Sequence, residues 1–273
     1  MKKILTLALI ALALTAQSQT HQLVKLWETD SVVAIPESVL PDFENGILYI
    51  SLIDGGGWDA DGKGGVAKLN MYGKNYQPTW ISGLNAPKGM GMSGNRLYAA
   101  DISEVVVVDI ANGKIEKKIP IDSATGLNDI TVSNNGIVYV SDSRTGKIWR
   151  IENDKPVLFL ENIKGVNGLK AVGDDLLIGA GQQFVKADKN KNLTTIVEVP
   201  QAIDGIEPVG NGDYIVTSWS GYIYYVTADG KFETMLDTHV EKMNTADIGY
   251  DAKRRIVYVP TFNAKRIIAY QLK

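Results

Sequence analysis

Six polar residues recur at nearly regular intervals, each ahead of a short segment rich in Val, Ile and Tyr. They are Glu37, Lys88, Asn128, Asn167, Asp204 and Asp247, separated by 51, 40, 39, 37 and 43 residues. Carboxylate and amide oxygens are the ligands that Ca²⁺, Mg²⁺ and Mn²⁺ prefer. If the fold gathers these side chains, the carboxylates and amides among them are candidate ligands for a divalent cation. The alternative is that the Asn and Asp side chains only form turn hydrogen bonds with their own backbone.

The elements that must position these residues are short strands. Apolar runs bounded by Gly, Asn and Asp recur through the chain, as in GILYISLID, GIVYVSDSRTGKIWRIE and RIVYVPTFNAKRIIAYQL, and no helical periodicity follows residue 20. This chemistry is typical of strands and turns. A repeat of roughly 40–50 residues is the length of a four-stranded propeller blade. The sequence therefore predicts an all-β protein, a six-bladed β-propeller with the six polar residues around the mouth of its central channel.

The two ends of the chain together make one blade. The 26 residues after Asp247 and the 18 residues numbered 19–36 add up to one repeat. We therefore expect the N-terminal segment QLVKLWET to form the outer strand of the sixth blade, which would close the ring and remove an exposed sheet edge. The Gly-rich segment 55–65, GGGWDADGKGG, is inserted between the second and third strands of the first blade.

Residues 1–18 have the pattern of a secretory signal peptide. Two lysines precede an apolar run too short to span a bilayer, and Ala16-Gln17-Ser18 provides a small-residue cleavage site. We therefore expect an exported protein, periplasmic or extracellular, with one domain over residues 19–273 and no membrane span after cleavage. The chain has no Cys, so disulfides and a lipid anchor on Cys are excluded. A net charge of -3 argues against nucleic acid as a partner.

Four motifs carry a family resemblance: PESV, GLNDITVSNNGIVYVSD, GVNGLKAV and AIDGIEPVGNGDYIV. They resemble the successive blade-start motifs of the gluconolactonase and senescence marker protein (regucalcin) family of six-bladed propellers, over essentially all of residues 19–273. The resemblance implies a divalent cation in the channel held by Glu37, Asn167 and Asp204, with Asn128 near the metal and the substrate. Calcium-dependent phosphotriesterases of the diisopropylfluorophosphatase type look similar. Ca²⁺ is the preferred ion, with Mg²⁺, Mn²⁺ and Zn²⁺ as alternatives.

The chain departs from that family in two places. The family's Gly-Glu-Gly-Pro around the first ligand is Ile35-Pro36-Glu37-Ser38 here, and an Arg that often stands two residues before the second-motif Asn is replaced by Gly126. Loss of that Arg weakens the case for a sugar-acid lactone as the substrate, because its guanidinium would have donated paired hydrogen bonds to substrate oxygens. With only two His, at 21 and 239, the chain cannot supply the His dyad of paraoxonase-like propellers.

The leading hypothesis is a metal-dependent hydrolase that opens a lactone, a sugar derivative or a related ester. Asp204 or Asp247 would take a proton from the attacking water. Four further side chains are candidates for substrate binding, each with a structural alternative as a solvated or packing residue: Asn128, Lys88, Trp219 and, as a lid, Trp58. A non-catalytic propeller that binds a small ligand or a protein is the rival of another class, and a phosphotriesterase-like hydrolase differs only in its substrate.

Overall fold

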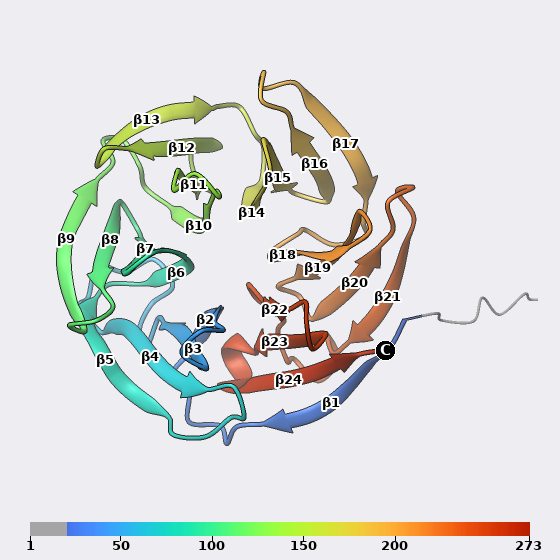
Figure 1. Cartoon of the computed structure of the whole chain (residues 1–273), viewed down its shortest axis with the longest axis horizontal. Coiled ribbons are helices and arrows are strands. Elements are labelled where there is room, and N and C mark those ends of the chain that lie inside the picture. Colours follow the sequence, from blue (N-terminus) through green and yellow to red (C-terminus); the bar gives the residue numbers. More distant parts are fainter. Residues whose placement is uncertain (1–20) are drawn as a thin grey trace, which may run out of the picture.

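Six four-stranded antiparallel sheets stand in a ring around a central channel (Figure 1). The computed structural model describes residues 21–273, so the predicted signal peptide 1–18 lies outside the described residues. A short 3-10 helix, η1 (Phe262–Ala264), is the one helical element among them. The protein is therefore a six-bladed β-propeller, as the repeat length predicts. No helix within residues 21–273 is long and apolar enough to cross a membrane.

Each blade uses four strands, ordered from the channel outward. The inner strands are β2 (Pro36–Asp42), β6 (Pro87–Ser93), β10 (Leu127–Val132), β14 (Val166–Val172), β18 (Ile206–Gly210) and β22 (Gly249–Asp251). The second strands are β3 (Ile47–Leu52), β7 (Arg96–Asp101), β11 (Val138–Asp142), β15 (Asp175–Ala180), β19 (Asp213–Ser218) and β23 (Ile256–Pro260). The third strands are β4 (Gly64–Asn70), β8 (Glu104–Asp109), β12 (Lys147–Glu152), β16 (Gln183–Ala187), β20 (Tyr222–Val226) and β24 (Ile267–Leu272). The outer strands are β5 (Gln77–Leu84), β9 (Lys114–Pro120), β13 (Lys155–Leu160), β17 (Leu193–Glu198), β21 (Phe232–Asp237) and β1 (Leu23–Glu28).

The N-terminal strand closes the ring. Strand β1 pairs antiparallel with β24, and Leu23 lies opposite Leu272. Trp27 of β1 contacts Tyr258, and its ring passes so close to Gly73, at φ +74°, that a Cβ there would meet it at 2.6 Å. The first and last strands of the propeller thus share one sheet, as the arithmetic of the two chain ends predicts.

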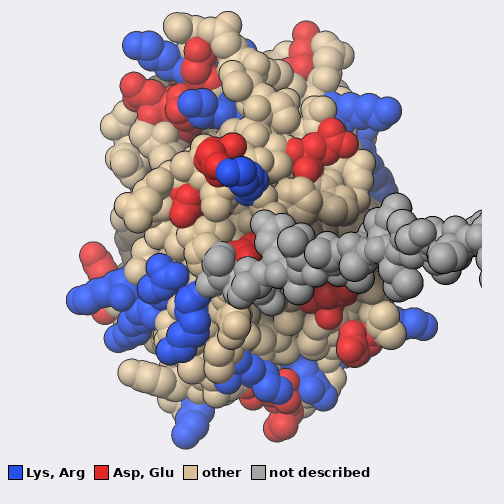
Figure 2. All heavy atoms as spheres, turned by 90° about the vertical axis from the view of Figure 1, so that its right-hand side faces the viewer, with Lys and Arg blue, Asp and Glu red and all other residues tan. Residues whose placement is uncertain are grey.

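Apolar side chains pack between neighbouring blades. One cluster joins Val105 and Val107 of the second blade to Leu127 and Val140 of the third, and all four are fully buried. Five similar clusters join the other blades. The edge of the ring carries both acidic and basic side chains on the side seen in Figure 2. Packing between blades therefore fixes the inner strands that line the channel.

A β-bulge near the start of the inner strands shapes the channel wall. In β14, Val166 pairs with Ala180 but Leu169 pairs with Ile178, so the inner strand holds one extra residue, and β2, β6 and β10 share this shift. In a regular strand, residues three apart point to opposite faces; the extra residue lets both Asn167 and Lys170 reach the channel side. Position 168 has room only for Gly, because a Cβ there would lie 1.7 Å from the Asp204 carbonyl oxygen of the next blade.

Candidate active site in the central channel

Five of the six predicted residues gather at one end of the channel. We call this group the upper ring: Glu37, Lys88, Asn128, Asn167 and Asp204. Glu37, Lys88 and Asp204 keep only 4–5% of their surface exposed and Asn128 keeps 8%. The sequence predicts a group around the channel mouth; the structure buries four of the five side chains and leaves Asn167 partly exposed, and Trp58 lies against Lys88.

Two oxygens of the upper ring have no hydrogen-bond partner. Asn167 Nδ2 donates to Asp204 Oδ1 at 2.9 Å, and Asn128 Nδ2 donates to Ser143 Oγ at 3.0 Å. Glu37 Oε2 and Asn167 Oδ1, in contrast, are buried without a partner. Buried polar atoms in folded proteins are nearly always paired, so two unpaired oxygens in one cluster are available to coordinate a ligand.

The charges of the upper ring are strongly perturbed. Burial raises the pKa of Glu37 well above its usual range, against the opposing effect of the Lys88 ammonium. Burial raises the pKa of Asp204 to about 7, although Lys88 and the Asn167 hydrogen bond act the other way. The pKa of Lys88 is lowered, chiefly by burial and in small part by the Arg144 guanidinium, despite the nearby Glu37 and Asp204. Perturbed pKa values of this kind are common at functional sites.

Trp58 covers the ring from above. Its indole lies 4.3 Å from Lys88 Nζ and 4.7 Å from the Arg144 guanidinium carbon, so two cations face one aromatic ring. The side chain of Arg144 also crosses Gly126, where a Cβ would meet its carbons at 2.6–2.9 Å. Arg144 therefore occupies the space beside the position at which the sequence lacks the expected Arg.

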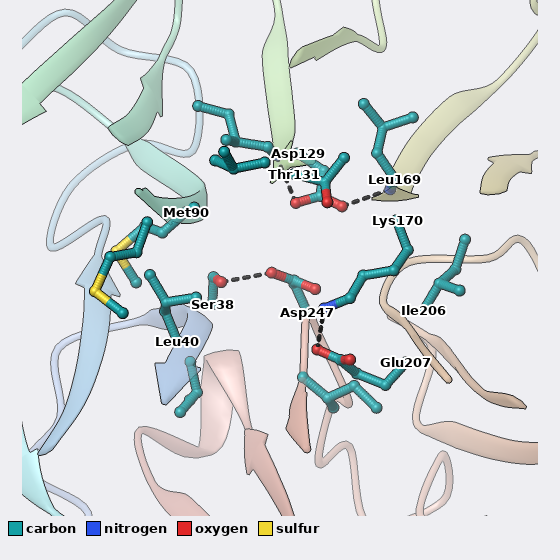
Figure 3. Close-up of a pocket in the computed structure, with 16 residues that line it drawn as sticks. Ser38, Leu40, Met90, Asp129, Thr131, Leu169, Lys170, Ile206, Glu207 and Asp247 are labelled. Carbon is teal, nitrogen blue, oxygen red and sulfur yellow. Dashed lines mark hydrogen bonds and ion pairs between the residues drawn. The ribbon is translucent and has the colours of Figure 1, made fainter. Parts of the chain in front are cut away.

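A polar cavity of about 210 Å³ lies below the upper ring (Figure 3). We call its polar wall the lower layer: Ser38, Asp129, Thr131, Lys170, Glu207 and Asp247. Most of these groups bond across blades: Lys170 Nζ donates to Glu207 Oε1 at 2.8 Å, and Asp129 Oδ2 accepts from the Leu169 backbone N–H at 2.6 Å. Thr131 Oγ1 accepts from the Ala171 N–H at 3.0 Å.

Asp247 lies in this lower layer, one position away from the upper ring. The backbone of Asp247 bonds beside Ser38 of β2, and Ser38 Oγ donates to Asp247 Oδ2 at 2.5 Å. Burial raises the pKa of Asp247 to about 7, against the Ser38 hydrogen bond. The sixth blade thus departs from the register of the repeat, and its short inner strand β22 begins two residues after Asp247.

Sequence reasoning missed most of the lower layer, including Asp129, Lys170 and Glu207. A signal exists: Asp129 directly follows Asn128, and Lys170 and Glu207 stand three residues after Asn167 and Asp204. In β14 the three-residue offset reflects the bulge, which a repeat alignment on single positions does not reveal.

Trp219 lies away from the upper ring in its described contacts. It is 46% exposed and packs edge-on against Phe262 of η1 at 5.4 Å. Its carbonyl accepts a hydrogen bond from Asn244 Nδ2 at 2.8 Å. These contacts join the fifth and sixth blades at the rim, and the substrate-binding role stays a prediction.

The upper ring fits a divalent cation by the chemistry of its oxygens. Among residues 21–273 no three His, Asp or Glu side chains form a metal-binding group. An ion would therefore depend on the unpaired Glu37 Oε2 and Asn167 Oδ1 together with Asp204, a hard oxygen set of the kind that Ca²⁺ or Mg²⁺ prefers. Lys88 adds a positive charge beside this set, which offsets part of its attraction for a cation.

Solved structures with the same architecture include enzymes. A streptogramin B lyase superposes with a TM-score of 0.66 at 12% identity, over 93% of this chain and 97% of the other. A virginiamycin B lyase from Staphylococcus aureus gives a TM-score of 0.64 at 14% identity, over 92% and 99%. A protein of unknown function from Bacteroides thetaiotaomicron gives 0.71 at 11% identity, over 93% and 76%. At such identities the likeness establishes the propeller fold alone.

No protein-family model matches the chain, and no curated protein sequence is significantly similar to it. The gluconolactonase and regucalcin family is therefore not confirmed beyond its fold.

Proposed function

We propose that the protein is a divalent-metal-dependent hydrolase that opens a lactone or related ester in the central channel. The observation that carries the proposal is the pair of buried, unpartnered oxygens, Glu37 Oε2 and Asn167 Oδ1, beside Asp204. A bound cation would complete the coordination of these oxygens and supply Lewis acidity toward an ester carbonyl.

The residues around this set have complementary tasks. Glu37, Asn167 and Asp204 hold the ion, and Asn128, fixed by its bond to Ser143, orients the substrate or the attacking water. Asp247 takes the proton from that water, because its pKa of about 7 leaves it a competent base at neutral pH. Asp204 has a similar pKa and is the alternative base.

Export of the mature protein, residues 19–273, to the periplasm or the medium belongs to this proposal. A hydrolase placed there would meet small molecules from outside the cell. Cleavage after residue 18, measured by mass spectrometry of the protein recovered from a secreting host, tests this part separately.

The test is turnover by purified residues 19–273. A panel of lactones, aryl esters and phosphotriesters is incubated with Ca²⁺, Mg²⁺, Mn²⁺ or a chelator. We expect cation-dependent hydrolysis that falls at least about 100-fold in Glu37→Gln and Asp204→Asn, the scale of losing a main electrostatic group. Glu44→Gln, at an exposed carboxylate in the turn after β2, is the matched control and should keep full activity.

Two results would contradict the proposal. Full activity in Glu37→Gln would remove the metal assignment, and absence of turnover across the panel would remove the hydrolase assignment. Incorporation of ¹⁸O from labelled water into the product separates hydrolysis from a lyase cleavage, which takes up no water.

A non-catalytic binding propeller is the second candidate, favoured by Lys88. Its ammonium already faces Glu37 and Asp204, so the ring has an internal positive charge without a metal. A protein of this kind would turn over nothing on the panel and would show no stabilisation by added cations.

A further inference from the structure

Arg144 has a position that the proposed reaction does not explain. It follows the second strand of the third blade, and its guanidinium carbon lies 4.7 Å from the ring of Trp58. Lys88 Nζ lies 4.3 Å from the same ring. An indole face attracts each cation, but the two cations repel one another, and Arg144 is close enough to lower the pKa of Lys88, after the larger effect of burial.

The surroundings hold Arg144 in this place. Its backbone N–H donates to Asp142 Oδ1 at 3.1 Å, and its guanidinium donates to the Thr125 carbonyl at 3.3 Å. The stem crosses Gly126, where even an Ala side chain would collide with it. The guanidinium is thus directed toward Trp58 by a turn and by the absence of a side chain at Gly126.

The charge of Arg144 lacks an acidic partner. Within residues 21–273, neither Arg144 nor Lys88 forms an ion pair with a carboxylate. Lys88 faces Glu37 and Asp204 on the channel side, but Arg144 stands outside that ring. Asp61, in the same loop as Trp58, pairs with Lys63 at 3.2 Å. An arginine fork held against an aromatic ring without an acid is suited to bind an oxyanion.

We propose that Arg144, together with Trp58 and Lys88, binds a carboxylate or phosphate monoester group on the small molecule that enters the channel. Arg144 would grip the two oxygens of the anion, and Trp58 would cover it. This inference rests on the proposed function for the reacting end of the substrate and adds its class: the preferred ester or lactone carries a negative charge remote from the bond that breaks.

Equilibrium binding tests this site without turnover. Butyrate, methyl phosphate and neutral butyramide are titrated into the protein at low salt with a chelator present, with calorimetry and tryptophan fluorescence as readouts. The chain has five Trp, so the signal of Trp58 is the difference between the wild type and Trp58→Phe. We expect one or both anions to bind and to change that signal, with weaker binding as salt rises.

A matched pair of variants identifies the residue. Arg144→Gln should weaken anion binding at least about tenfold, the loss expected for one charge-assisted hydrogen bond. Lys147→Gln is the control. Lys147 Nζ also faces a tryptophan, at 5.7 Å from the centre of the Trp149 ring, but Lys147 belongs to β12 and has no described contact with Trp58 or Lys88. Equal affinity for butyramide, or unchanged affinity in Arg144→Gln, would overturn the inference. If only one of the two anions binds, that result shows whether the site takes a carboxylate or a phosphate monoester.

The outcomes separate this inference from the proposed function. Anion binding that depends on Arg144, without turnover of any ester, would support the anion site and reject the hydrolase. Turnover of neutral and anionic lactones at equal kcat/KM, unchanged in Arg144→Gln, would support the hydrolase and reject the anion site.

Discussion

The channel has two layers of buried charge that differ in how their polar atoms are satisfied. In the lower layer, Asp129 accepts two backbone N–H bonds and Lys170 pairs with Glu207. In the upper ring, Glu37 Oε2 and Asn167 Oδ1 have no partner. Burial raises the pKa of Asp129 and of Glu37 alike, so the difference lies in the partners and not in the degree of burial.

This difference distinguishes groups that stabilise the propeller from groups that are free to bind a ligand, although both lie on the same inner strands. A paired group that joins two blades stabilises the ring, whereas an unpaired buried oxygen costs stability and persists only where something else needs it. Apart from Asp247, the proposed base, the lower layer therefore acts mainly to cross-link the inner strands, and the upper ring is the better candidate for a binding site. Substitutions in the lower layer should lower the free energy of unfolding, whereas substitutions in the upper ring should leave it unchanged or raise it.

The largest expected effect is on stability, at Asp129. Asp129→Ala removes the acceptor of the Leu169 N–H and should lower the free energy of unfolding by about 1–3 kcal/mol, the cost of a buried unsatisfied donor. Glu37→Gln should leave stability unchanged or raise it, because it removes a buried charge with an unpaired oxygen. Urea unfolding followed by far-UV circular dichroism measures both.

Asp129→Asn is the control for this comparison. It keeps one acceptor oxygen, which can face the Leu169 N–H, and removes the buried charge, so part of the stability should return. If Glu37→Gln destabilises the protein as much as Asp129→Ala does, the two layers do not differ in the way described.

The second prediction concerns pH. The pKa of Asp204 is raised from an ordinary value of 3.8 to about 7, so the folded state holds its proton more tightly than the unfolded state. Its contribution to stability is therefore fully present below about pH 4 and is lost as the pH rises to about 7. Asp204→Asn should flatten this fall. Urea unfolding in chelator between pH 4 and 7.5 checks the slope, and an unchanged slope in the variant would refute the assignment.

The smallest expected effect is at the cover of the ring. Lys88 is only 4% exposed and lies under Trp58, so it should resist acetylation in the native protein. Trp58→Ala should raise the labelling rate of Lys88 several-fold, as seen by peptide mass spectrometry, while the partly exposed Lys147 reacts equally in both proteins. Equal protection of Lys88 in the variant would show that another element closes this end of the channel.

Much of the fold could be predicted from local chemistry. The spacing of the blade-start residues gave six blades, and the lengths of the two chain ends gave β1 as the closing strand. The prediction was less complete for the site. Asp247 was expected with the other five residues, but its backbone bonds beside Ser38 and moves it to the lower layer. A repeat pattern reports spacing along the chain and does not report a one-residue shift between blades.

What the sequence by itself determined is the ring of strands and the six polar residues near its axis, because strand and turn chemistry acts over a few residues at a time. Only the tertiary structure decided which oxygens stay unpaired, which acids titrate near neutral pH and which cations meet at Trp58. Those properties depend on burial and on partners from other blades, such as the Asn167 amide beside Asp204 and the Arg144 guanidinium over Trp58. Such contacts join residues tens of positions apart, and no local pattern encodes them.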